Sequence, residues 1–438
     1  MQRYYDQFVN YNLRSDEEVI RDMYKADGLQ RRGELKKDSV NGFLGISILC
    51  LFTRLLNFSK CSTFHMVWGI IIDYMHAALE GVAADLFNIY ENILSPQQLK
   101  VLDEYLKSIT PPQGMTRRPR SFSLRPYWKA KEYRAVLLFY ALPCLQELLP
   151  PRNFLNLKQF VNALHILLSD NISRAQLSEA ATCLDNFTVG YQRLYGLENV
   201  TYNLHLCRHL MDMVIQQGPL WCYSNFIFES GNGYLVSLIR GTKSIINEIA
   251  NKHTTILTVS KFITENTISP DALKFCSDVM QCNYSKKQKE IDNVLTTGSL
   301  SVAEISEEEC VLLELKNVNI SDCKVQYYNR VIRKGIVYCS KSYCTGKVYD
   351  DSCVLLEDGS YAVIDKIVKS SANELLCLIK PIRIAQGSHI IPSIKTCCYD
   401  VFDAPRVVLF SDISRKCLFI TFRDKSFVCH IPNFYERD

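Results

Sequence analysis

The chain has 438 residues, enough for two or three domains, and its 47% hydrophobic and 22% charged residues are ordinary for a globular protein. The N-terminus, MQRYYDQFVN, lacks the basic and apolar regions of a secretion signal. Apolar runs such as Ile46–Phe52 and Val67–Ile72 are far shorter than the roughly 20 residues that span a bilayer. These features predict a soluble intracellular protein, nuclear or cytoplasmic, with no membrane partner. The net charge of +4 identifies no partner, because polyanion binders are recognised by local clusters of charge.

The 18 cysteines are numerous, but their spacing does not indicate a metal or redox site. No C-x-x-C pair occurs, so the sequence predicts neither a zinc ribbon nor a thioredoxin-type site. We therefore expect reduced cysteines that behave as small apolar residues.

In chain order, residues 1–40 are polar and predict an amphipathic helix followed by a connector. The β-branched run Val67–Asp73 predicts a buried strand that ends on a carboxylate. From Tyr74 onward the spacing becomes helical, with apolar residues at three- and four-residue steps, namely Met75, Leu79, Val82, Leu86 and Ile89. Ser95-Pro96 then predicts the start of a new helix, and residues 130–215 predict several more.

The last part of the chain has a different pattern. Residues 283–309 are polar and are interpreted as a linker. After about Cys310, short alternating runs are separated by turn residues, and the sequence EDGS between two apolar runs predicts a hairpin with a two-residue turn. Residues 310–438 are therefore predicted to form a small all-β domain.

Two acidic residues stand at positions that suggest chemistry. Asp73 follows the predicted strand, with His76 three residues later, and Glu229 separates an apolar run from a Gly/Asn turn. Each has a simpler explanation. An Asp at the end of a strand often caps the next helix, and an acid in the first turn of a helix is favoured by the helix dipole. His205 and His209 have the i, i+4 spacing of a metal-ligand pair, but no third ligand is near, so ordinary helix-face histidines are expected.

The segment from Arg117 to Arg134 is the clearest indication of a partner, because it carries seven basic residues and one acid. Aromatic residues are interleaved with the charges, which suits contact with phosphates together with base or sugar packing. A solvated surface is the alternative explanation. The candidate DNA-binding residues are Arg117, Arg118, Arg120, Arg125, Trp128, Lys129, Lys131 and Arg134.

Three blocks occur in a fixed order: FHMVWGIIIDYMHAALEGV, RPRSFSLRPYWKAKEYRAVLLFYALPCL, and NVTYNLHLCRHL followed by QGPLWCYSNFIFESGNGYLVSLIRGT. Together they resemble the transposases of CACTA (En/Spm-like) elements and their animal relatives, over roughly residues 15–265. The C-terminal sequence CHIPNFYERD resembles an extension of the animal members. The D-x-x-H match is short, whereas the second and third blocks are long.

The resemblance implies an RNase H-like fold and a DDE-type site in which three acids bind two divalent metal ions. Asp73 would be the second acid, His76 would complete the D-x-x-H signature, and Glu229 would be the third acid. Asp73 and Glu229 would be the metal ligands, with Mg²⁺ or Mn²⁺ as cofactor if the protein is catalytically competent and no cofactor otherwise. The chain departs from its relatives at Glu80, where they usually have an apolar residue.

The first acid of the family is expected upstream of this chain. None of the early aspartates follows a β-branched apolar run, namely Asp6, Asp16, Asp22, Asp27 and Asp38. Without a first acid the site could not hold two ions. Whether the chain is an enzyme is therefore left open, and we expect a transposon-derived DNA-binding protein that is a catalytically incomplete fragment or remnant. The alternative is an active metal-dependent transposase whose first Asp comes from a missing N-terminal region.

The expected architecture is α+β. An incomplete RNase H-like α/β core is interrupted by a large helical insertion and followed by the small all-β domain. The core comprises residues 41–110 and 216–265, and the basic and helical insertion comprises residues 111–215. Residues 266–309 are expected to form a helix and a linker. DNA is the expected partner, either terminal repeats or without sequence preference, and a homo-oligomer is possible.

Overall fold

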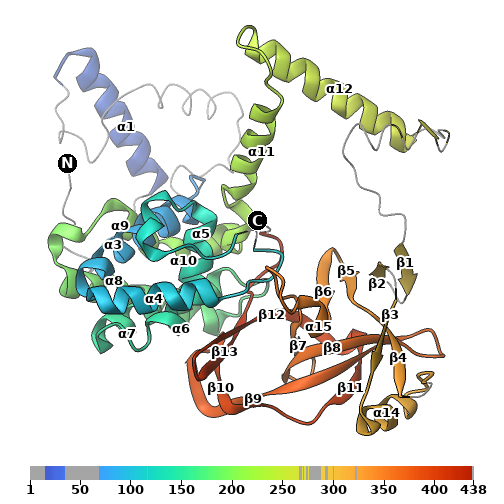
Figure 1. Cartoon of the computed structure of the whole chain (residues 1–438). Coiled ribbons are helices and arrows are strands. Elements are labelled where there is room, and N and C mark those ends of the chain that lie inside the picture. Colours follow the sequence, from blue (N-terminus) through green and yellow to red (C-terminus); the bar gives the residue numbers. More distant parts are fainter. Residues whose placement is uncertain are drawn as a thin grey trace.

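A computed structural model describes residues 15–34, 69–115, 117–265, 269, 271–272, 275, 288–291, 294–298, 300–320 and 323–436. Helices fill the described chain up to Glu265, and every described strand follows residue 287. Figure 1 shows these two regions side by side, with the helices up to α12 in blue to yellow-green and the strands in gold to red. We call residues 69–265 the helical part and residues 288–436 the β part. The chain is therefore a mixed α+β protein, as predicted.

An amphipathic helix was predicted within residues 1–40, and α1 (Asp16–Arg31) is found there. The helical part consists of η1 (Met75–Ala83), α3 (Ala84–Ile93), α4 (Pro96–Ser108), η2 (Phe122–Tyr127), α5 (Ala130–Ala135), η3 (Val136–Tyr140), α6 (Ala141–Leu145), α7 (Pro151–Leu167), α8 (Arg174–Tyr195), η4 (Leu197–Asn199), α9 (Tyr202–Arg208), α10 (Leu210–Gln217), η5 (Leu220–Tyr223), α11 (Phe226–Ser237) and α12 (Ile245–Glu265).

Local signals explain where several of these helices begin. Ser95 accepts a hydrogen bond from the N–H of Gln98, and the Gln98 side chain reaches back to Ser95, so α4 begins with the predicted cap. Met75, Leu79, Val82 and Leu86 are buried, as the helical spacing predicted. The first part of this helix, η1, has the wider π-helical turn, which the spacing does not reveal.

The β part contains two antiparallel sheets. A four-stranded sheet has the order β1-β2-β5-β6, and a larger sheet has the order β11-β9-β10-β13-β12-β7-β8-β4-β3. The elements are β1 (Gln288–Ile291), β2 (Val294–Thr297), β3 (Ser301–Glu304), α14 (Glu307–Glu314), β4 (Lys324–Tyr328), β5 (Arg330–Arg333), β6 (Ile336–Cys339), α15 (Lys341–Cys344), β7 (Cys353–Leu356), β8 (Tyr361–Lys369), β9 (Leu375–Ile391), β10 (Ile394–Phe402), β11 (Arg406–Leu409), η6 (Phe410–Asp412), β12 (Ile413–Phe422) and β13 (Lys425–His430).

The larger sheet closes on itself because the long strand β9 pairs with β8 along its first half and with β10 along its second half. The hairpin predicted at EDGS joins β7 to β8. Its loop is longer than the predicted two residues, since the N–H of Leu356 bonds to the carbonyl of Ser360 across three residues. Gly359 supplies the positive φ of 82° that such a loop needs.

Two regions differ from the sequence predictions. Residues 69–73 form a turn, a bend and an irregular stretch, so the described end of the run Val67–Asp73 is not a strand; residues 67–68 lie outside the described residues. Residues 288–304, predicted to be linker, contribute β1, β2 and β3. Their polar composition hides them, because each has only four residues; β1 and β3 lie at sheet edges, whereas β2 lies between β1 and β5. The RNase H-like sheet would draw on residues 41–68, which are not described, and it stays a prediction.

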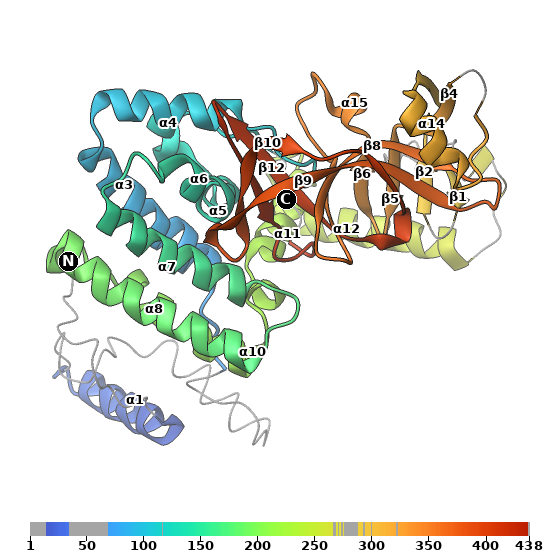
Figure 2. The same ribbon diagram turned by 90° about the horizontal axis from the view of Figure 1, so that it is seen from below.

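The helical and β parts share one hydrophobic core. The turn between β9 and β10 and the strands β12 and β13 contribute buried residues to the same cluster as the helices. The ring of Phe422 on β12 stacks on Tyr105 of α4, with ring centroids 4.4 Å apart and planes at 22°. Figure 2 shows this end of the strands against α4 and α6, while α11 and α12 project from the helical part in Figure 1. Of the helices described, none is long and apolar enough to cross a membrane.

Candidate functional site

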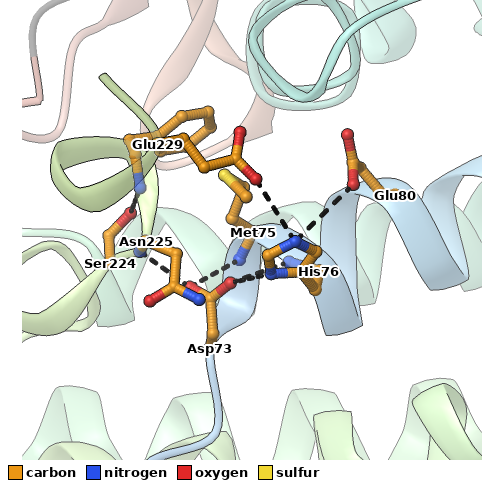
Figure 3. A network of polar contacts seen from close by, with 8 residues as sticks. Asp73, Met75, His76, Glu80, Ser224, Asn225 and Glu229 are labelled. Atoms are coloured by element: carbon orange, nitrogen blue, oxygen red, sulfur yellow. Dashed lines mark hydrogen bonds and ion pairs between the residues drawn. The ribbon is translucent and has the colours of Figure 1, made fainter. Parts of the chain in front are cut away.

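Asp73 lies immediately before η1, and its carboxylate joins the starts of two helices (Figure 3). Its Oδ1 accepts hydrogen bonds from the backbone N–H groups of Met75 at 3.3 Å and Asn225 at 3.0 Å. Its Oδ2 accepts from the backbone N–H of His76 at 3.2 Å and from the Nδ1 of the same residue at 2.5 Å. Asp73 is thus a helix cap, one of the two roles considered from the sequence. The cap also fixes Asn225, 152 residues away at the start of α11.

Glu229 reaches the same place from α11. It lies in the first turn of that helix. The Gly/Asn sequence after Glu229 suggested that the helix begins later in the chain, but α11 already begins at Phe226. Its Oε1 is 3.4 Å from Nε2 of His76, whose other ring nitrogen contacts Asp73. Asp73 and Glu229 therefore flank one imidazole ring. The two acids differ in environment, since the Asp73 side chain is 13% exposed and the Glu229 side chain is 55% exposed.

Glu80 adds a third carboxylate on the side of Glu229. It lies one turn after His76 on η1, and its Oε2 is 4.0 Å from the His76 Nε2. The cluster Asp73–His76–Glu80–Glu229 is acidic and open to solvent at three of its four members. We call this the acid cluster.

The acid cluster does not fit a divalent ion in the arrangement observed. A carboxylate has about four acceptor positions, and three backbone N–H groups and the His76 ring already engage those of Asp73. The His76 ring also lies between Asp73 and Glu229, where a bridging ion would have to bind. Within the described residues no group of three or more His, Cys, Asp or Glu side chains is arranged to hold a metal ion.

Three of the predicted DNA-binding residues lie in the interior. Arg125 is buried, donates to the Asn88 side chain at 3.0 Å and to the carbonyl of Phe122, and pairs with Glu91. Arg134 is buried beside Glu436, and Trp128 packs among core aromatics. These side chains support the fold and present no surface to a polyanion. The sequence did not reveal the burial of the two arginines because their acidic partners, Glu91 and Glu436, are distant along the chain.

The remaining cations of the segment lie nearer the surface. Arg120 is held by Glu132 through two contacts at 2.5 and 2.8 Å, and Arg117 reaches the same carboxylate at 3.4 Å. Arg118 is exposed and donates to backbone carbonyls of the β part at Lys347 and Val348. Lys129 is exposed and Lys131 is half-buried. Of these cations only Lys131 lies on α5, the helix that packs against η1.

Two further groups bear on the sequence predictions. His205 and His209 lie on α9 and at its end, with ring centroids 5.0 Å apart, and His209 contacts Asp212, so the pair is part of a local side-chain cluster. Tyr127 is one of the aromatic residues that the sequence interleaves with the charges; it is 73% exposed, two residues before Lys129, and can stack on a base. The cysteines among the described residues are free thiols, most of them buried.

No family model, curated protein or solved structure matches the chain.

Proposed function

We propose that this chain is a DNA-binding protein related to the cut-and-paste DDE transposases of the CACTA group, and that its acid cluster is a catalytically incomplete remnant of their site. The observation that carries the proposal is the meeting of Asp73 and Glu229 at one imidazole. The resemblance requires two acids far apart in the chain to lie together, and ordinary helix caps would not need to meet. The network around Asn225 supports the same pairing, because it ties the start of α11 to Asp73.

The proposed DNA surface consists of the exposed cations of the basic segment, Arg117, Arg118 and Lys129, with Tyr127 beside them. Phosphate contacts made by such cations release counterions, so the affinity should fall steeply with salt. Arg125, Trp128 and Arg134 are buried and do not contribute to this surface. The proposed DNA surface is therefore a small patch. We therefore propose binding without strong sequence preference, since direct base readout needs more side chains in a groove.

A titration of labelled duplex DNA followed by fluorescence anisotropy at several salt concentrations tests the surface. Reversing Arg117, Arg118 and Lys129 to Glu should lower the affinity and reduce the slope of log K against log salt by roughly 0.9 for each lost phosphate contact. A matched variant reverses three exposed cations elsewhere, Arg152, Lys316 and Lys324, and should change neither quantity much. Equal effects of the two triple variants would remove the basic segment from the proposal.

Catalysis is tested on the same DNA with Mg²⁺ or Mn²⁺ present. The incomplete site should leave the strands uncut. The informative variant is Asp73→Asn, because an Asn side chain still accepts hydrogen bonds as a helix cap while the negative charge is lost. If the unsubstituted chain nicks the DNA and Asp73→Asn does not, the proposal of an incomplete remnant is wrong. The chain would then be an active transposase whose remaining metal ligand comes from elsewhere.

A further inference from the structure

The last described residues of the chain do not continue the sheets of the β part but pack against the helical part. After β13, residues 431–436 run back between the two parts, where Figure 1 marks the C-terminus. Asn433 is buried, and its Nδ2 donates to the carbonyl of Leu168 at 3.0 Å. Its Oδ1 accepts from the N–H groups of Tyr435 and Glu436 at 3.2 and 3.0 Å. Asn433 therefore stabilises the turn from which the side chains of Tyr435 and Glu436 extend towards the helical part.

Glu436 contacts the residue that follows Asp73. Its side chain is only 5% exposed, and its Oε1 accepts a hydrogen bond from the hydroxyl of Tyr74 at 2.6 Å. Its other oxygen is 3.4 Å from a guanidinium nitrogen of Arg134, which is equally buried. Burial, and then the neighbouring Glu436 carboxylate, raise the pKa of Tyr74 well above its usual range, so the hydroxyl remains the donor.

Tyr435 contacts the segment that leads to the other acid. Its ring stacks on Trp221 of η5, with centroids 4.3 Å apart and planes at 12°. Only two residues separate the end of η5 from α11, the helix that carries Glu229. Between these two contacts the ring of Tyr74 meets Phe226, the first residue of α11, edge to face at 6.2 Å. The C-terminal residues thus touch both segments that bear the acids.

We infer that residues 433–436 form a brace that positions the acid cluster: Glu436 holds Tyr74 and so Asp73, while Tyr435 holds Trp221 and so the start of α11. The brace joins residues that are 362 positions apart, so it makes the arrangement of the acid cluster depend on the β part being in place. Its geometry stands without reference to function, and its relevance to DNA chemistry rests on the proposed function. Glu436 acts here as a positioning residue, because it touches none of the acids directly.

Hydrogen–deuterium exchange of the full chain tests the brace. Glu436→Ala should speed exchange about tenfold in residues 73–83 and 225–237, while β12 and β13 keep their protection. Tyr74→Phe removes only one hydroxyl and should give a smaller change in the same two places. The matched control is Lys425→Ala, which removes the contact of Lys425 with Glu147, another contact between the two parts, and should leave both places unchanged.

A spectroscopic signature separates positioning from general support. The ring nitrogens of His76 report the placement of Asp73, so their ¹⁵N shifts should move in Glu436→Ala towards those of a free imidazole. Glu436→Gln retains an acceptor for Tyr74 and should restore them. Unchanged exchange and shifts in Glu436→Ala, or faster exchange of equal size in β12 and β13, would overturn the brace. Both measurements omit DNA and metal ions, so a chain that binds no DNA overturns the proposed function and leaves this result standing.

Discussion

At the scale of single residues, Asp73 carries more hydrogen bonds than a simple cap, because it accepts from two helices at once. Asp73→Ala should lower the free energy of unfolding by about 2 kcal/mol, since a lost cap costs about 1 kcal/mol and the N–H of Asn225 loses its acceptor as well. Asp73→Asn should cost less than half of that, because the amide oxygen still accepts. Urea unfolding followed by circular dichroism measures both. Equal losses would show that the charge of Asp73 matters more than its acceptor geometry.

His165 makes stability depend on pH. Burial lowers its pKa to about 4, and its ring nitrogen contacts the carbonyl of Leu138 at 2.8 Å. The unfolded chain, with a His pKa near 6.5, binds the proton first, so stability is complete above about pH 6.5 and falls towards pH 4 by up to about 1.4 kcal/mol per pH unit for this group. Burial also lowers the pKa of His430 to about 4, so this residue likewise makes the folded protein less stable as the pH falls.

The check on His165 is the slope of the free energy of unfolding between pH 6.5 and 4.5. His165→Gln cannot take up the proton, so the variant should lose about one proton's share of that slope. A slope that stays the same in His165→Gln would mean that this ring is protonated in the folded protein.

At the scale of elements, the sequence predicted what local signals encode. The spacing of Met75, Leu79 and Val82 predicted a helix with a buried face, and Ser95-Pro96 predicted where α4 begins. The position of Asp73 predicted a cap, but neither its contact with Asn225 nor the burial of Arg125 could be predicted, because their partners lie far along the chain. The basic residues of a segment show the sign of its charge, but they do not show which of its side chains tertiary packing will bury.

Gly81 in η1 and Gly231 in α11 allow close helix packing to be compared with helix propensity. A Cβ on Gly81 would lie 2.5–2.8 Å from side-chain atoms of Asn203 on α9, including its Cβ, so the helices approach too closely for any side chain there. Gly81→Ala should cost about 1–3 kcal/mol through overpacking. Gly231, inside α11, has open space around it, and Gly231→Ala should stabilise the protein by roughly 0.5–1 kcal/mol through helix propensity. Thermal unfolding of both variants distinguishes packing from propensity, and a stabilising Gly81→Ala would contradict the close approach of η1 and α9.

At the scale of the whole molecule, the helical and β parts are joined through their interior rather than by a surface contact. Strands β12 and β13 and the turn before β10 enter the same core as the helices, and residues 433–436 add the brace. Surface ion pairs between the parts, such as Arg423 with Glu104 at 4.0 Å, contribute little by comparison. A shared core of this kind should make the two parts unfold together.

Phe410 provides the test, because it is buried in a cluster that belongs to the β part alone and packs edge to face on Tyr338. Phe410→Ala should cost about 3–5 kcal/mol, as for other buried Phe rings. Trp128 and Trp221, the tryptophans among the described residues, lie in the helical part, so their fluorescence reports on that side of the molecule. If the shared core couples the parts, the fluorescence midpoint in urea should fall as far as the midpoint measured by exchange in β7 and β8. If the fluorescence midpoint of Phe410→Ala stayed at the value of the unsubstituted protein while β7 and β8 unfolded at lower urea, the helical part would be stable by itself. The shared core would then be a contact between two independent domains.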